Sequence, residues 1–304
     1  MNIISILSEI LLLFIYVILG LYIKKRQFVT ETGIQEISKI VVNVAMPLLV
    51  ISSVNIEYKP EYANNMLLIA VLSFLYLATV TITSKKLASL VTDDKVDRSS
   101  MRYALVFGNI VFLGYPLSYA LFGDVGVLYA SVYVAMQNIF QWTLGVHFFS
   151  TDKFKMSNLK KLLNPGLIAI CIGLTLLFLG IQTPPYILRI IKGVGAISVP
   201  LALMMIGATL ADFRIKEIFT DKRAQFVAFF KSIVFPALFL FLLMALPIDK
   251  TLKSVLVIMA AAPVQASATV IAHNFGGDSI VVAKCVALTT TLCALTLPAF
   301  LLLI

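Results

Sequence analysis

Long apolar stretches separated by short polar segments dominate this chain. A helix needs roughly 20 mostly apolar residues to cross a hydrocarbon core, because every backbone amide must be satisfied within the segment. We therefore predict an all-α integral membrane fold with ten transmembrane helices. The ten stretches are Ile4–Ile23, Ile34–Val54, Ala63–Ser84, Met101–Leu121, Val125–Phe149, Pro165–Gly180, Ile187–Ala211, Ala224–Leu246, Leu252–His273 and Ile280–Leu303.

Composition agrees with this pattern. Hydrophobic residues make up 60% of the 304 residues, charged residues only 13%, and the mean hydropathy is +0.99. A soluble domain has about a quarter of its residues charged. All three cysteines, Cys171, Cys285 and Cys293, fall inside predicted spans, where small packing residues are expected. Their spacing gives neither a disulfide framework nor a metal site, so we expect no cofactor and no bound metal.

The net charge of +9 raises the alternative of nucleic-acid binding, but the distribution of the basic residues argues against it. Sixteen lysines and arginines follow the odd-numbered spans, and five lie on the opposite side. This bias places the loops after odd-numbered spans in the cytoplasm and both termini outside. Lys24–Arg26 comes after the first span, whereas a cleavable signal peptide has its basic region first. We therefore predict a multi-pass protein of the cell membrane.

An offset of 153 residues aligns parts of the chain with one another. Lys39–Leu48 then falls on Lys192–Leu201, which superposes Pro47 on Pro200, and Phe122-Gly123 falls on Phe275-Gly276. Five spans separate the two copies, so the second enters the membrane from the opposite face. We predict two inverted five-helix repeats, residues 1–149 and 165–304, joined by a cytoplasmic linker, 150–164. Inverted repeats are typical of secondary transporters.

Spans 4 and 9 occupy equivalent places in the two repeats, and both contain helix-breaking residues. Gly108, Gly114 and Pro116 interrupt span 4, and Pro263 interrupts span 9. A helix broken inside the membrane exposes polar backbone groups, and its half-helix N-termini carry partial positive charge. That arrangement favours an anion near the bilayer centre. Pro47 and Pro200 are further candidate hinge positions.

The polar side chains at mid-depth are mostly neutral. No carboxylate lies at the centre of spans 4, 5 or 9, which argues against a cation/proton antiporter. Lys39 and Lys231 are expected to extend toward a membrane surface. Neutral amides can donate hydrogen bonds to a carboxylate, although they also join helices to one another. The candidate substrate-binding residues are Asn109 and Gln265, then Asn43 and Gln137, with Trp142 and Ser267 beside them.

Several motifs together resemble the auxin efflux carrier family, which includes plant PIN carriers and bacterial malate-permease-like proteins. They are Asn43–Leu49, Gly108–Leu117, Gln137–Thr143, Asn164-Pro165, Pro200–Ala208 and Ala262–Gln265, and they extend over most of the chain. The resemblance implies crossing, broken helices 4 and 9, as in bile-acid carriers and sodium/proton antiporters. It also implies a scaffold of helices 1, 2, 6 and 7 that forms a homodimer, and a transport unit of helices 3–5 and 8–10. The implied substrates are small organic anions such as auxin, malate or malonate.

We therefore expect a secondary carrier that moves a small organic anion by an elevator mechanism. The alternative is a transporter-like membrane sensor that binds a small ligand without moving it. An enzyme is disfavoured, because no paired acids, nucleophile–base pair or His-based metal motif occurs at depth. The expected partners are the organic anion, membrane lipids and a second copy of the chain. Coupling stays open between Na⁺, H⁺ and the membrane potential alone.

Overall fold

The structure is a computed structural model that describes residues 3–149, 163–211 and 219–304. Most of the predicted linker 150–164 therefore lies outside the described residues. In the part of the chain that is described, every regular element is a helix. Extended backbone pairs there at one isolated bridge, between Gly108 and Val264. The all-α prediction is confirmed.

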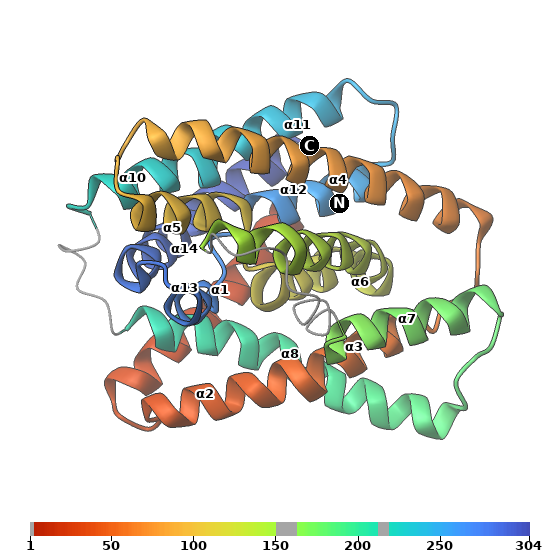
Figure 1. Cartoon of the computed structure of the whole chain (residues 1–304). Coiled ribbons are helices and arrows are strands. Elements are labelled where there is room, and N and C mark those ends of the chain that lie inside the picture. The colour runs from red at the N-terminus through yellow and green to blue at the C-terminus, as the bar shows by residue number, and fades with distance from the viewer. Residues whose placement is uncertain (1–2, 150–162, 212–218) are drawn as a thin grey trace. The chain divides into compact units, whose positions relative to one another are not determined.

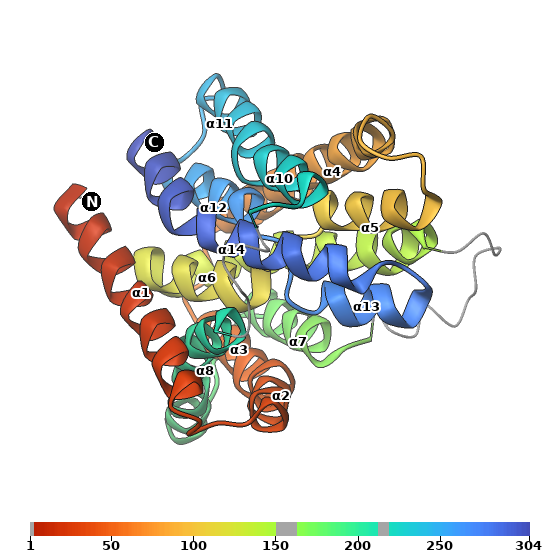
Figure 2. The ribbon, with the colours of Figure 1, turned by 90° about the vertical axis from the view of Figure 1, so that its left-hand side faces the viewer.

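The chain divides into two compact units, and the first comprises residues 1–69, 111–135 and 163–212. Its helices include α1 (Ile3–Lys25), α2 (Glu31–Ile40), α3 (Met46–Ser53), α7 (Pro165–Phe178) and α8 (Pro185–Leu210). Helix α1 lies against α8 (Figure 2). A side chain at Gly20 would collide with the backbone of Met204, and one at Gly207 with the carbonyl of Val17. Small residues thus let these two helices approach closely, as is common between membrane helices.

The second unit comprises residues 70–110, 136–162 and 213–304. It contains most of α4 (Pro60–Ser89), and α14 packs against several of its other helices (Figure 1). Aspartates cap four of these helices, accepting hydrogen bonds from backbone N–H groups that would otherwise lack a partner. Asp94, Asp221, Asp249 and Asp278 serve α5, α10, α12 and α14 respectively. The helices of this unit are α5 (Lys95–Val106), α10 (Lys222–Phe229), α11 (Phe235–Met244), α12 (Lys250–Ala261), α13 (Ala268–Phe275) and α14 (Ser279–Leu302).

Six helical runs among the described residues are long and apolar enough to cross a membrane. The longest, Ile110–Phe148, contains α6 (Tyr115–Phe140) and extends over parts of two predicted spans. Within it Gly123 has φ 59° and ψ −144°, which breaks the helix between those spans. The span predicted over 165–180 appears as the shorter α7, and the one over 252–273 as α12 and α13. The structure is thus that of a protein with several apolar, membrane-length helices, and the count of ten stays a prediction.

Three proline-containing helices continue by widening one turn. The π-helical turns Val41–Ala45, Ile110–Gly114 and Phe230–Val234 each end two residues before a proline: Pro47, Pro116 and Pro236. A proline ring clashes with the carbonyl four residues earlier and cannot donate a hydrogen bond, and a π turn accommodates both defects. Pro200 lies inside α8, which is continuous from Pro185 to Leu210. The chain is therefore helical at Pro47, Gly114, Pro116 and Pro200, and their role as hinges stays a prediction.

Candidate functional site

Helices α5 and α12 end at the same place inside the second unit. After Val106 and after Ala261 the chain leaves the helix, and the two extended segments pair in antiparallel fashion. The backbone N–H of Asn109 donates to the carbonyl oxygen of Pro263 at 2.6 Å, and that of Gln265 donates to Phe107 at 3.3 Å. We call residues 107–109 and 262–265 the crossing. Its backbone groups satisfy one another, as the interior of a membrane requires.

Side chains of the second unit complete the hydrogen bonding of the crossing. The Gln137 amide accepts from the backbone N–H of Gly108 at 3.2 Å and donates to its carbonyl at 2.9 Å. The hydroxyl of Thr289 accepts from the N–H of Val264 at 3.0 Å. Gln137, a predicted ligand, thus holds the backbone of the crossing in place with both ends of its amide.

A buried cation lies beside the crossing, contrary to the expectation that Lys231 extends toward a membrane surface. Lys231 is 1% exposed, and its Nζ donates to the carbonyl oxygen of Val106 at 3.3 Å. A side chain at Gly108 would meet this Nζ at 3.3 Å, so the ammonium is packed against the crossing. No carboxylate among the described residues lies within ion-pair distance of it. The carbonyl end of a helix carries partial negative charge, which accounts for the position of the ammonium.

The signal for Lys231 was its isolation in the sequence. It is the one charged residue between Arg223 and Asp249, and it lies eight residues after Arg223. At 1.5 Å per residue this is about 12 Å of helix, more than a lysine side chain extends. Thr289 and Tyr103 were missed as well, and they carry no comparable signal, because serines, threonines and tyrosines are frequent along the whole chain.

The Gln265 side chain lies in the crossing and is nearly buried. Its Nε2 donates to the hydroxyl of Tyr103 at 2.9 Å. Tyr103 is itself fully buried in α5, one helical turn before Phe107. The tyrosine therefore fixes the orientation of the amide and leaves its carbonyl oxygen as an acceptor.

Asn109 differs from the two glutamines. It is 4% exposed, and its backbone is held by Pro263, yet its side-chain amide makes no hydrogen bond to any described residue. A nearly buried polar group without a partner costs free energy unless water or a ligand supplies the bond. Asn109 is thus the residue of the crossing whose side-chain N–H groups are available as donors to something else.

The remaining candidates make none of the hydrogen bonds described for the crossing. Asn43 belongs to the first unit, in a π-helical turn, where it is exposed and its amide donates to the carbonyl of Lys39 at 2.8 Å. Ser267 is exposed at the start of α13 without a capping hydrogen bond, and Trp142 is partly buried in the π-helical turn Gln141–Gly145. The residues brought together are Gly108, Asn109, Gln137, Pro263 and Gln265.

An ion-pair network joins helix ends elsewhere in the second unit. Asp221 accepts from Arg223 and from Lys284, each at 3.0 Å, and Arg223 also contacts Asp97 at 2.6 Å. The bonds from Arg223 and Lys284 hold the pKa of the Asp221 carboxyl below its usual range, although burial acts in the opposite direction. Asp278 does not pair with Lys284 and instead caps α14. The network fixes α5, α10 and α14 to one another at these ends.

Comparison with known proteins supplies the family. The family described as "Membrane transport protein" matches residues 5–301. An uncharacterized transporter of Methanocaldococcus jannaschii is 24% identical over 295 residues, which cover 94% of each chain. Both matches extend through the crossing, and the relative is named as a transporter without a stated substrate.

Proposed function

Because the chain belongs to the membrane transport protein family, that of the auxin efflux carriers, we propose that it is a secondary carrier for a small organic anion. The observation that carries this proposal is the unpaired side-chain amide of Asn109 at the crossing, next in sequence to Gly108, against which the buried Lys231 packs. An amide N–H and a nearby positive charge are suitable partners for a carboxylate. The substrates to be tested are malate, malonate and indole acetate.

The surroundings of the crossing support an anion over a cation. Lys231 compensates the partial negative charge at the carbonyl end of α5. No described side chain caps the start of α13, where the N–H of Ala268 donates to the carbonyl oxygen of Gln265. The electrostatic potential at the crossing therefore favours a negatively charged ligand. Gln137 and Gln265 position the backbone and the amides around the bound group.

The proposed transport mechanism is an elevator-type movement of one part of the chain against another. The 153-residue repeat and the two interrupted helices support ten spans in two inverted copies. The first unit contains the helices of predicted spans 1, 2, 6 and 7, which supports their role as the scaffold, together with residues 111–135 of predicted spans 4 and 5. Proposed spans 3–5 and 8–10 then form the transport unit, and the scaffold forms the dimer.

Uptake into proteoliposomes tests the carrier. We expect saturable uptake of at least one of the three radiolabelled acids by the wild-type protein, and a loss of about tenfold or more in Asn109→Ala. Asn64→Ala is the matched control, since this exposed amide lies in α4 outside the crossing. Uptake that is equal in wild type and Asn109→Ala contradicts the assigned site. Ligand-dependent thermal stabilisation without any flux favours the alternative, a membrane sensor.

A further inference from the structure

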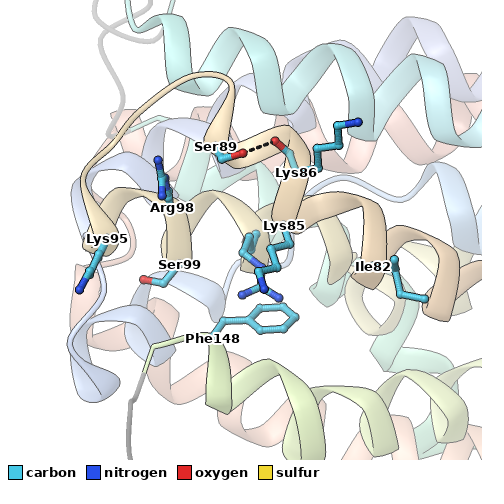
Figure 3. Close-up of a pocket in the computed structure, with 9 residues that line it drawn as sticks. Ile82, Lys85, Lys86, Ser89, Lys95, Arg98, Ser99 and Phe148 are labelled. Carbon is cyan, nitrogen blue, oxygen red and sulfur yellow. Dashed lines mark hydrogen bonds between the residues drawn. The ribbon is translucent and has the colours of Figure 1, made fainter.

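A cavity of about 410 Å³ lies in the second unit, at the end of α4 and the start of α5 (Figure 3). The charge bias assigns this side of the membrane to the cytoplasm. Basic side chains surround the cavity, and each of the two helices also contributes one serine, Ser89 from α4 and Ser99 from α5. Its cationic lining consists of Lys85, Lys86, Lys95, Arg98 and Arg102.

Most of this positive charge has no counter-charge in the described residues. Arg98 pairs with Asp93, but Lys85, Lys86 and Lys95 have no carboxylate within ion-pair distance. These three exposed lysines line a concave space, where their positive charge favours an anion. The cavity therefore favours the binding of a ligand that carries at least one negative charge.

Arg102 gives the cavity a specific binding group. Its guanidinium lies over the ring of Phe148, with 4.1 Å between Cζ and the ring centroid. Its Nε is buried and has no hydrogen-bond partner. A planar guanidinium held on an aromatic ring presents its remaining N–H groups in a fixed direction and binds phosphate in a bidentate manner. The positive-inside bias alone would produce an exposed lysine-rich loop. Such a loop would not contain a buried, unsatisfied donor like the Nε of Arg102.

An apolar stripe on α4 runs up to the same cavity. Val71, Leu75 and Ile82 are exposed, and Ile82 at the cavity edge is 74% exposed. Lys86 follows Ile82 by one helical turn, so the stripe continues directly into the cationic lining. The order along the helix, apolar surface followed by positive charge, matches that of an acyl chain followed by its phosphate.

We propose that this cavity binds the phosphate head group of an anionic phospholipid, with the acyl chains along Val71, Leu75 and Ile82. Basic pockets between membrane helices on the cytoplasmic side bind anionic head groups in this way. Lys85, Lys86 and Lys95 supply the charge, and Arg102 on Phe148 supplies the directed hydrogen bonds.

Native mass spectrometry of the detergent-purified full chain tests this site with phosphatidylglycerol and phosphatidylcholine. The variant replaces Lys85, Lys86 and Lys95 by glutamine. The matched control replaces Lys25, Lys222 and Lys250 by glutamine. These lysines are exposed and lie outside the cavity, so the control loses the same amount of charge. We expect wild type and control to bind phosphatidylglycerol, phosphatidylcholine to bind neither, and the cavity variant to bind about tenfold more weakly.

Three outcomes overturn the proposal. Equal binding by the cavity variant and wild type removes the cavity from the interaction. Equal losses in both triple variants show a diffuse charge effect. Inorganic phosphate or glycerol phosphate that displaces phosphatidylglycerol at equal concentration identifies a soluble phosphate as the ligand. All three lysines are exposed, so the cavity variant should melt at the wild-type temperature in detergent without added lipid.

Discussion

The Nζ of Lys231 lies 3.3 Å from the carbonyl oxygen of Val106, the last residue of α5. The final carbonyls of a helix have no partner within that helix, and here one of them is bound by a buried ammonium from a different helix. A buried lysine with a single, long hydrogen bond contributes little to folding, because its desolvation opposes the gain. Its presence at the crossing is better explained by the charge that it brings to the proposed anion site.

Replacement of Lys231 by methionine separates these two roles. Methionine has a similar volume, so we expect the melting temperature to stay the same or rise, since a buried charge is removed. Anion transport should fall by about tenfold or more, because the amide of Asn109 loses its neighbouring positive charge. Thermal melts in detergent and proteoliposome flux measure the two quantities. Normal flux together with a lowered melting temperature would show that Lys231 is purely structural.

Gln137→Leu should destabilise the protein by about 2–4 kcal/mol, because the N–H and the carbonyl of Gly108 both lose their side-chain partner. Gln141→Leu is the matched control, since Gln141 is also buried but its side chain makes no hydrogen bond with a described residue. We expect it to change stability by less than about 1 kcal/mol. Denaturation of both variants in detergent measures the difference. Similar losses would mean that volume, rather than the hydrogen bonds to Gly108, determines the effect.

These residues also show how far the sequence alone leads. Gly108 and Pro263 indicate where the helices end, because glycine and proline act on the backbone locally. The partners of the freed groups depend on tertiary packing, so Lys231, Thr289 and the bracing role of Gln137 are visible only in the structure. Pro200 matches Pro47 in the repeat, yet only the turn before Pro47 is π-helical. The local sequence thus indicates where the helical hydrogen bonding is interrupted. Tertiary packing determines how the helix accommodates the interruption.

Asp221→Asn tests the ion-pair network. The asparagine keeps the helix cap on α10 and removes the charge that binds Arg223 and Lys284, so we expect a loss of about 2 kcal/mol at neutral pH. Asp249→Asn, which alters a cap without an ion pair, should cost much less.

The pH dependence of the same variant follows from the lowered pKa of Asp221. A depressed folded-state pKa gives stability that is present above the unfolded-state value, about 4, and is lost as the pH falls below it. Wild type and Asp221→Asn should therefore differ at neutral pH and converge as the pH drops below about 4. Melting curves in detergent across this range measure the convergence. A constant difference at all pH values would contradict the role of the carboxylate charge.

Transport should not depend on sodium. A sodium ion at the crossing would need carbonyl oxygens as ligands. Carbonyl oxygens in and beside the crossing that already accept hydrogen bonds include those of Val106, Phe107, Gly108, Ala260, Pro263 and Gln265. The buried amino group of Lys231 occupies the same place and donates a hydrogen bond there. We therefore expect the anion to move according to its own gradient and the membrane potential.

Proteoliposomes with a potassium diffusion potential set by valinomycin provide the measurement. Flux of the anion should respond to the sign of the potential and stay unchanged when external sodium is replaced by choline. Lys231→Met gives the informative comparison, because without the ammonium the carbonyl of Val106 is free to coordinate a cation. Wild-type flux that requires sodium would show that the hydrogen bonds of the crossing open during transport. That result would also show that Lys231 does not take the place of a coupling sodium ion.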